Sequence, residues 1–272
     1  MAVEEVYLRP DDYELETLTR DIGDLPFWVD LLKRERPARV LEIGCGCGRL
    51  TLPLARLGAA RGFTITGLEI EPTMLCRAQQ HARDETPETQ RALRLALGDA
   101  RDLDAALQAR NVGSCPFDVV LMTYGVAHHL TTTDQQLRVW RGARRWLRAG
   151  GLLAVDVGAP DLSRLSTGRD GCTPRRLDLE VSRDGRTLRR TVATRYCAAS
   201  QVERLEYDYC VTEADGSQRD YRSAFAMRVY FPRELELLFH ATGFTVERMI
   251  GSYAGEPYTA RAPLLLTLGR AA

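Results

Sequence analysis

The feature that most constrains the fold is a regular alternation of short apolar runs and amphipathic segments between residues 24 and 157. Each apolar run is continuous, which is typical of strands buried on both faces of a sheet. The segments between the runs carry apolar residues at helical spacing. Strands that alternate with helices favour a parallel sheet covered on both faces. Strands are predicted at 39–44, 62–70, 92–100, 117–123 and 151–157, and helices at 24–36, 49–58, 71–85 and 133–150.

The pattern changes near residue 158. Between residues 176 and 230, β-branched and aromatic side chains follow a period of two, and turn signals stand at 182–186 and 213–217. Period-two segments joined by Asp-Gly turns are typical of hairpins. We therefore expect an inserted antiparallel sheet of three or four strands.

The chain returns to the earlier pattern after the insertion. A helix is predicted at 232–244, followed by strands at 245–251 and 262–270. About a dozen turn-like residues separate these two strands, which is too short for a comfortable parallel crossover. The last strand should therefore be antiparallel in a Rossmann-like, mostly parallel sheet of seven strands.

The predicted domain organisation follows from these two patterns. Residues 1–157 and 231–272 should form the Rossmann-like domain, with an N-terminal helical lid, and residues 158–230 the inserted antiparallel sheet. The insertion should serve the substrate or a subunit interface.

Composition restricts the partners and the compartment. Basic and acidic residues balance at 37 each, so no overall field favours nucleic acid or anionic lipid. Seven cysteines, an odd number without framework spacing, indicate free thiols in a reducing compartment. No apolar stretch approaches a membrane span, and the acidic N-terminus lacks the apolar core of a signal peptide. We expect a cytoplasmic protein with no membrane or nucleic-acid partner.

The segment VLEIGCGCGRL, residues 40–50, places a glycine loop between a strand and a helix. Gly44, Gly46 and Gly48 allow a tight turn and the close approach of a ligand at the strand's carboxyl end. Dinucleotide-binding loops usually read G-x-G-x-x-G, whereas this loop reads G-x-G-x-G and has Glu42 just before it. A carboxylate beside the loop suits a cationic amino-acid ligand better than a pyrophosphate.

Two further acids follow the next strands. Glu69 lies 21 residues after Gly48, where a carboxylate can bind both hydroxyls of a ribose. Asp99 follows the third strand and could accept a hydrogen bond from an adenine amino group. A metal site at Cys45 and Cys47 is disfavoured, because no Cys-x-x-Cys or paired histidine completes four ligands.

Taken together, these motifs resemble the class I S-adenosylmethionine-dependent methyltransferases, specifically the small-molecule branch of secondary metabolism. The similarity covers LEIGCGCGRL, GLEIEPTML, GDAR, FDVVLMTYGVAHHL and LRAGGLLAVDV, in the family's order, over roughly residues 24–157. The resemblance implies S-adenosylmethionine as cofactor and S-adenosylhomocysteine as product. It implies no metal.

The resemblance also implies which residues contact the cofactor. Gly44, Cys45, Gly46 and Gly48 would line the methionine moiety, Glu42 would reach its amino group through the loop or a water, and Thr123 would face its carboxylate end. Glu69 would bind the ribose hydroxyls, Ile70 and Met74 would lie along the adenine, and Asp99 and Ala100 would read the adenine edge.

Candidate catalytic residues follow the fourth strand. His128 and His129 stand at the expected mouth of the site, and histidine's pKa near 6.5 suits proton removal from a phenol, hydroxyl or ammonium. The alternative is that these histidines pack against the cofactor or a helix. In the small-molecule branch an N-terminal segment with tyrosines folds over the cofactor, which makes Tyr7, Tyr13 and Trp28 candidate substrate-binding residues.

The inserted sheet supplies the other substrate candidates, among them Tyr207 and Arg228. Because only alternate side chains share a face, one face of this sheet could bind a ring-bearing metabolite while the other makes a homodimer. The predicted function is methyl transfer from S-adenosylmethionine to an N or O nucleophile of a small molecule.

Two alternatives are weighed against that function. A nucleic-acid methyltransferase should have a Pro-Pro-aromatic motif after the fourth strand, where this chain reads MTYGVAHHL at 122–130. A protein of the same fold that binds the cofactor without methylating, as a cyclase or a binding partner, has the same cofactor motifs and stays open.

Overall fold

The computed structural model describes residues 5–18, 22–108, 116–167 and 172–272. The chain divides into two compact units. One unit consists of Gly23–Ala159 with Tyr230–Ala272, and the other of Met1–Ile22 with Pro160–Val229. The described part contains no helix that is both long and apolar enough to cross a membrane.

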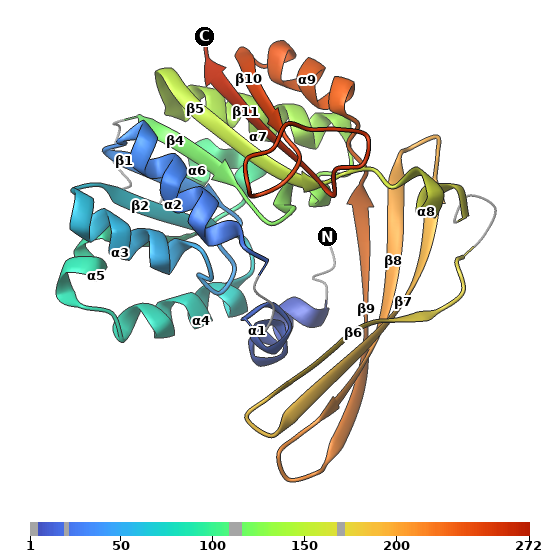
Figure 1. Cartoon of the computed structure of the whole chain (residues 1–272). Coiled ribbons are helices and arrows are strands. Elements are labelled where there is room, and N and C mark those ends of the chain that lie inside the picture. Colours follow the sequence, from blue (N-terminus) through green and yellow to red (C-terminus); the bar gives the residue numbers. More distant parts are fainter. Residues whose placement is uncertain (1–4, 19–21, 109–115, 168–171) are drawn as a thin grey trace. The chain divides into compact units, whose positions relative to one another are not determined.

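The larger unit contains a seven-stranded sheet in the order β10-β11-β5-β4-β1-β2-β3 (Figure 1). Its strands are β1 Arg39–Ile43, β2 Thr64–Glu69, β3 Leu93–Leu97, β4 Phe117–Met122, β5 Leu147–Gly158, β10 Phe244–Ile250 and β11 Leu264–Ala271. Neighbouring strands from β3 to β5 pair in parallel, whereas β11 is antiparallel to both β5 and β10. The predicted sheet with a reversed last strand is confirmed.

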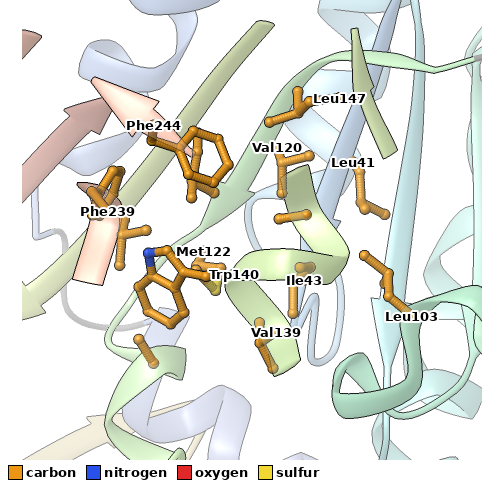
Figure 2. Packing of buried hydrophobic residues seen from close by; sticks show 14 of the residues in the cluster. Leu41, Ile43, Leu103, Val120, Met122, Val139, Trp140, Leu147, Phe239 and Phe244 are labelled. Carbon is orange, nitrogen blue, oxygen red and sulfur yellow. The ribbon is translucent and has the colours of Figure 1, made fainter. Parts of the chain in front are cut away.

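Helices cover both faces of this sheet, because alternate strand residues point to opposite sides. Val120 and Met122 of β4 pack with α7 and α9, while Val119 and Leu121 pack with α2 and α3. Figure 2 shows the first of these cores, with Trp140 packed beside Phe239. The helices of this unit are α2 Asp24–Glu35, α3 Thr51–Arg61, α4 Pro72–Arg83, α5 Pro87–Ala92, η2 Ala100–Asp102, α6 Leu103–Gln108, η3 Val126–His129, α7 Thr133–Trp146 and α9 Pro232–Ala241.

Two helix ends differ from the prediction for physical reasons. Helix α3 continues past Gly58 to Arg61 and is capped by Gly62, whose φ of 82° is the left-handed cap conformation. Gly58 serves packing instead, since a Cβ there would lie 2.6 Å from the Phe63 carbonyl oxygen. Helix α7 ends at Trp146, and the next four residues join β5.

The second unit is built on a four-stranded antiparallel sheet in the order β6-β7-β8-β9. Its strands are β6 Arg176–Arg183, β7 Arg186–Cys197, β8 Val202–Thr212 and β9 Gln218–Arg228, and its helices are η1 Glu5–Leu8, α1 Pro10–Leu18 and α8 Leu162–Thr167. The predicted inserted sheet is therefore confirmed, with four strands. Val6 and Leu15 of the N-terminal helices pack on one face of this sheet.

Buried acids of α1 fasten that helix to the sheet. Asp12 is 1% exposed, and its Oδ1 accepts hydrogen bonds from Arg186 at 2.8 Å and Arg219 at 2.5 Å. Glu16, four residues later on the same face of the helix, pairs with Arg190. Breaking such a pair leaves a buried charge uncompensated.

Asp12→Ala should therefore loosen α1 on the inserted sheet and destabilise this unit by about 2 kcal/mol. This is below the usual cost for a buried pair, because both arginines are partly exposed and also pair with Glu213. The measurement is thermal unfolding together with hydrogen exchange of residues 10–18. Asp11→Ala, at an exposed position of the same turn, is the control. Equal effects of the two variants would contradict the role given to Asp12.

Candidate functional site

The loop after β1 has a backbone that requires glycine. Gly44, Gly46 and Gly48 have φ values of 76°, 56° and 85°, all in the left-handed region. The amide nitrogens of Gly44 and Cys45 donate to the Leu68 carbonyl oxygen of β2 at 2.7 and 3.0 Å. A Cβ at Gly44 would stand 2.3 Å from Cγ2 of Val126, so the loop closely approaches η3.

Glu69 at the end of β2 ties this loop to the start of α4. Its carboxylate accepts hydrogen bonds from the amides of Gly46 at 2.8 Å and of Ile70 and Glu71 at 2.9 Å. The side chain is 8% exposed, and burial raises its pKa despite these three donors. Three of its roughly four acceptor positions are occupied, so it can accept further from a hydroxyl.

Glu42 on β1 is a buried acid that joins three segments. Its Oε2 accepts from the Thr51 hydroxyl of α3 at 2.5 Å, and its Oε1 accepts from the Thr123 hydroxyl at 2.9 Å. The side chain is 2% exposed, and burial raises its pKa to about 7 against the opposing effects of both hydroxyls and Arg49. Thr123, predicted at the carboxylate end of the cofactor, thus directs its hydroxyl proton to Glu42.

The apolar residues predicted along the adenine lie after β2. Ile70 is 50% exposed, which leaves apolar surface open at the end of the strand. Met74 is buried one turn of α4 later, with its Sδ 3.6 Å from Sγ of Cys47. Burial, with Glu69 and Glu42 nearby, raises the pKa of the Cys45 thiol, so this residue is neutral. Within the described ranges, no group of three or more His, Cys, Asp or Glu side chains could hold a metal ion.

Asp99 follows β3 and caps the short helix η2, which begins at Ala100. Its carboxylate accepts from the Arg101 amide at 2.9 Å and from Nε of Arg101 at 2.8 Å. Partial burial raises its pKa, but the Arg101 hydrogen bonds outweigh this effect and lower the pKa overall. The carboxylate is therefore ionised and open to further donors on its exposed side.

The two histidines after β4 differ in their surroundings. Nε2 of His128 accepts a hydrogen bond from the Gly158 amide at 3.0 Å, which makes the ring neutral with its proton on Nδ1. Tyr230, 6.0 Å from this ring, donates its hydroxyl to the Ala127 carbonyl. Burial and the neighbouring His128 lower the pKa of His129 to about 4. The Nε2 lone pair of His128 is therefore occupied by the Gly158 amide, and His129 is a weak base.

The predicted substrate residues lie in both units. Trp28 of α2 is fully buried, with its ring 5.1 Å from Phe27 and 6.4 Å from Tyr253. The other four residues, Tyr7, Tyr13, Tyr207 and Arg228, belong to the second unit.

Within the second unit these four residues have partners of their own. The rings of Tyr7 and Tyr13 lie 5.8 Å apart, and the guanidinium of Arg190 lies 4.5 Å from the Tyr207 ring. The buried Arg228 donates to the carbonyl oxygen of Gln201 at 3.1 Å and to its amide oxygen at 2.6 Å.

Sequence reasoning missed a second set of buried polar residues at the same edge of the sheet. Asp156 at the end of β5 is 1% exposed, and it accepts from the Gly125 amide at 3.0 Å and from the Tyr253 hydroxyl at 2.7 Å. Burial raises its pKa to about 6. The sequence signal for Asp156 was its place at the carboxyl end of a strand, as for Glu42 and Glu69.

Arg49, directly after the glycine loop, is the other missed residue. Its guanidinium donates to both carboxylate oxygens of Asp24, at 2.9 and 2.7 Å, and lies 4.8 Å from the Tyr124 ring. Asp24 is the first residue of α2 and 2% exposed. This ion pair joins α2 to the glycine loop.

The side chains and the glycine loop at this edge of the sheet fit a cationic nucleoside ligand. The loop lacks the side chains that would block a ligand at its glycines, and the buried acids Glu42 and Glu69 have raised pKa values that a nearby cation would lower. Ile70 adds apolar surface and Asp99 a hydrogen-bond acceptor. S-adenosylmethionine has the matching groups: an ammonium, a sulfonium, a ribose diol and an adenine.

Comparison with known proteins gives the same assignment. Residues 41–153 match a family model described as a methyltransferase domain. A cypemycin N-terminal methyltransferase from Streptomyces sp is 26% identical over 241 residues, which are 89% of this chain and 86% of that protein.

Solved structures share the fold along the whole chain. The sugar N-methyltransferase KedS8 from Streptoalloteichus sp has a TM-score of 0.69 and 24% identity, over 100% of this chain and 94% of that one. CalS10 from Micromonospora echinaspora, an amino pentose methyltransferase solved with S-adenosylmethionine bound, has a TM-score of 0.68 and 21% identity, over 96% and 95%. The resemblance to class I methyltransferases is confirmed, and the site fits S-adenosylmethionine, the cofactor bound in CalS10.

Glu69→Ala should weaken S-adenosylmethionine binding by about 10- to 100-fold, because it removes charged hydrogen bonds to the ribose and the anchor of Gly46. Calorimetric titration measures the change. Glu71→Gln is the matched control, since this equally buried acid caps α4 through the Thr73 amide and is given no cofactor contact. Equal losses in both variants would contradict the role of Glu69.

Binding of S-adenosylmethionine should also depend on the ionisation of Glu42. Its pKa of about 7 lies above the ordinary value, so the carboxylate that would accept from the ammonium is lost as pH falls below 7. The dissociation constant should then rise toward tenfold per pH unit. Calorimetry between pH 6 and 8 on wild type and Glu42→Gln tests this, because titration of the ligand's own amino group is common to both. Parallel profiles would rule out Glu42.

Proposed function

We propose that this S-adenosylmethionine-dependent methyltransferase methylates an amine nitrogen of a small molecule of secondary metabolism, leaving S-adenosylhomocysteine. The bound cofactor supplies a methyl group on a positively charged sulfur. Glu42, the glycine loop and Glu69 hold the cofactor, with Ile70, Met74, Asp99 and Ala100 at the adenine. Placement of the acceptor in line with the methyl then provides most of the rate.

The observation that carries this proposal is that neither histidine after β4 offers an effective base. The Nε2 lone pair of His128 is engaged by the Gly158 amide, and the pKa of His129 is about 4. An aliphatic hydroxyl attacks poorly unless a base removes its proton. A neutral amine has its own lone pair and needs no proton removal before attack, so this site suits an amine better than a hydroxyl.

Each histidine then has a role compatible with its surroundings. His128 positions η3 through its bond to Gly158. Neutral His129 accepts a hydrogen bond from an N–H of the amine that is to be methylated. This bond turns the lone pair of the amine nitrogen toward the methyl group. After transfer the product is an ammonium, whose proton passes to water.

The named relatives support an amine acceptor. The cypemycin enzyme is an N-terminal methyltransferase, KedS8 acts on a sugar nitrogen, and CalS10 is an amino pentose methyltransferase. Tyr7, Tyr13, Tyr207 and Arg228 of the second unit stay predicted acceptor-binding residues, and Trp28 stays a separate candidate in the larger unit. A cytoplasmic homodimer is part of the proposal, and the six described cysteines, which are all free thiols, agree with a reducing compartment.

Paired acceptors test the proposal directly. Two pairs of compounds are incubated with methyl-labelled S-adenosylmethionine. One pair is an amino sugar and the same sugar with a hydroxyl in place of the amino group. The other is a short peptide with a free or an acetylated N-terminus. We expect transfer to at least one free amine and at least about 100-fold less to its partner. The log of kcat/KM should rise with slope one up to the pKa of the amine, since only the neutral form attacks.

The histidine variants separate the two chemistries. His129→Ala should lower kcat/KM by less than about tenfold, whereas loss of a true general base costs about 10²- to 10⁴-fold. The amine assignment would be overturned if the enzyme preferred the hydroxyl compound and His129→Ala lowered kcat/KM by about 10²- to 10⁴-fold.

A further inference from the structure

We propose that Arg49 binds the α-carboxylate of S-adenosylmethionine and that Asp24 positions its guanidinium for this contact. The proposal concerns the cofactor end of the site and is independent of which acceptor is methylated. Glu42 precedes the glycine loop and Arg49 follows it, so a carboxyl group and a guanidinium flank the loop in the sequence. That pair complements the ammonium and carboxylate of an amino-acid moiety.

Arg49 is held rigidly at the end of the loop. It directly follows Gly48, and its side chain is 17% exposed. Two hydrogen bonds to the buried Asp24 fix the plane of the guanidinium, and Asp24 is itself fixed as the first residue of α2. A guanidinium has five N–H donors in a fixed fork, so fixing two of them also fixes the direction of the others.

A residue with a strained backbone also lies beside the guanidinium. Tyr124, whose ring lies 4.8 Å from Cζ of Arg49, has a φ of 54°, an unfavourable backbone conformation for a bulky side chain. Its neighbours hold this conformation, because Thr123 donates to Glu42 and the Gly125 amide donates to Asp156. Non-glycine residues strained in this way cluster at ligand sites.

The charge around Arg49 leaves a place for a zwitterion. Its positive charge acts on the pKa values of Glu42 and Asp156, lowering each, and Asp24 raises both. Tyr253 and the hydroxyls of Thr51 and Thr123 complete the polar groups that face these acids. An ammonium near Glu42 would compensate the acids. A carboxylate that accepts from N–H groups of Arg49 other than the two bound to Asp24 would gain charge-assisted hydrogen bonds.

The bound state also needs a donor for the carboxylate. Thr123, the residue given this place by the resemblance, uses its hydroxyl proton on Glu42 at 2.9 Å. Arg49 is the guanidinium that the chain places directly after the glycine loop. The competing interpretation is that the Asp24–Arg49 pair only fastens α2 to the loop.

A ligand without the carboxylate separates these interpretations. Calorimetry on the full chain would compare S-adenosylmethionine with decarboxylated S-adenosylmethionine, for wild type, Arg49→Gln, Arg49→Lys and Asp24→Asn. The quantity compared is the ratio of the two affinities, so a general loosening of the site cancels. Arg49→Gln should lower this ratio by about 30-fold, the scale of charge-assisted hydrogen bonds to a carboxylate.

The other variants test the fork and its positioning. Arg49→Lys keeps the charge without the planar fork and should recover less than a tenth of the wild-type ratio. Asp24→Asn should lower the ratio by about three- to tenfold, because the guanidinium stays but is less fixed. Thermal unfolding and circular dichroism confirm that each variant is folded, and if Arg49→Gln is not folded, Arg49→Lys carries the test.

Either of two results would overturn the proposal. An unchanged ratio in Arg49→Gln, with both ligands weakened alike, would make the ion pair structural only. Full recovery of the ratio in Arg49→Lys would mean that Arg49 acts only through its positive charge and not through directed hydrogen bonds to the carboxylate. Because no acceptor is present, these results are independent of the amine-transfer test, and failure of one leaves the other standing.

Discussion

Buried carboxyl groups at one edge of the parallel sheet hold the surrounding loops together. Glu42, Glu69 and Asp156 lie at or near the carboxyl ends of three strands, and each accepts hydrogen bonds from segments that are distant in the sequence. Burial of a carboxylate is costly, and here it raises all three pKa values even though every group is hydrogen-bonded. The glycine loop, the turn after β4 and the loop before β11 therefore depend on acids that a cationic ligand would further stabilise.

Local patterns predicted the fold because each of its elements has a local cause. Continuous apolar runs marked the parallel strands, and the short connection between 251 and 262 required the last strand to reverse. Helix ends were harder. Gly58 has the sequence signature of a helix stop, but it lies inside the helix, and the Phe63 backbone packs where its side chain would be. Such a contact is made after the helix ends and leaves no local pattern.

The residues of the site likewise divide into those that sequence spacing predicted and those that it did not. Gly44, Glu42 and Glu69 could be found from spacing, since the carboxyl ends of adjacent parallel strands meet at one edge. The partner of Asp156 is Tyr253, 97 residues away, and that of His128 is the Gly158 amide, 30 residues away. No spacing rule encodes these pairs. They bear on the proposed chemistry nonetheless, because the bond to Gly158 engages Nε2 of a histidine whose sequence context predicted a base.

The anionic edge also bears on the choice of acceptor. Transfer to a neutral amine moves one positive charge from sulfur to nitrogen, so the site contains the same net charge before and after the step. Buried acids can stabilise that charge throughout. Transfer to an alkoxide would instead require a further anion near Glu42 and Asp156. Like charge and low dielectric would oppose the formation of that anion. The acids that hold the loops thus favour the same nucleophile as the weakly basic histidines.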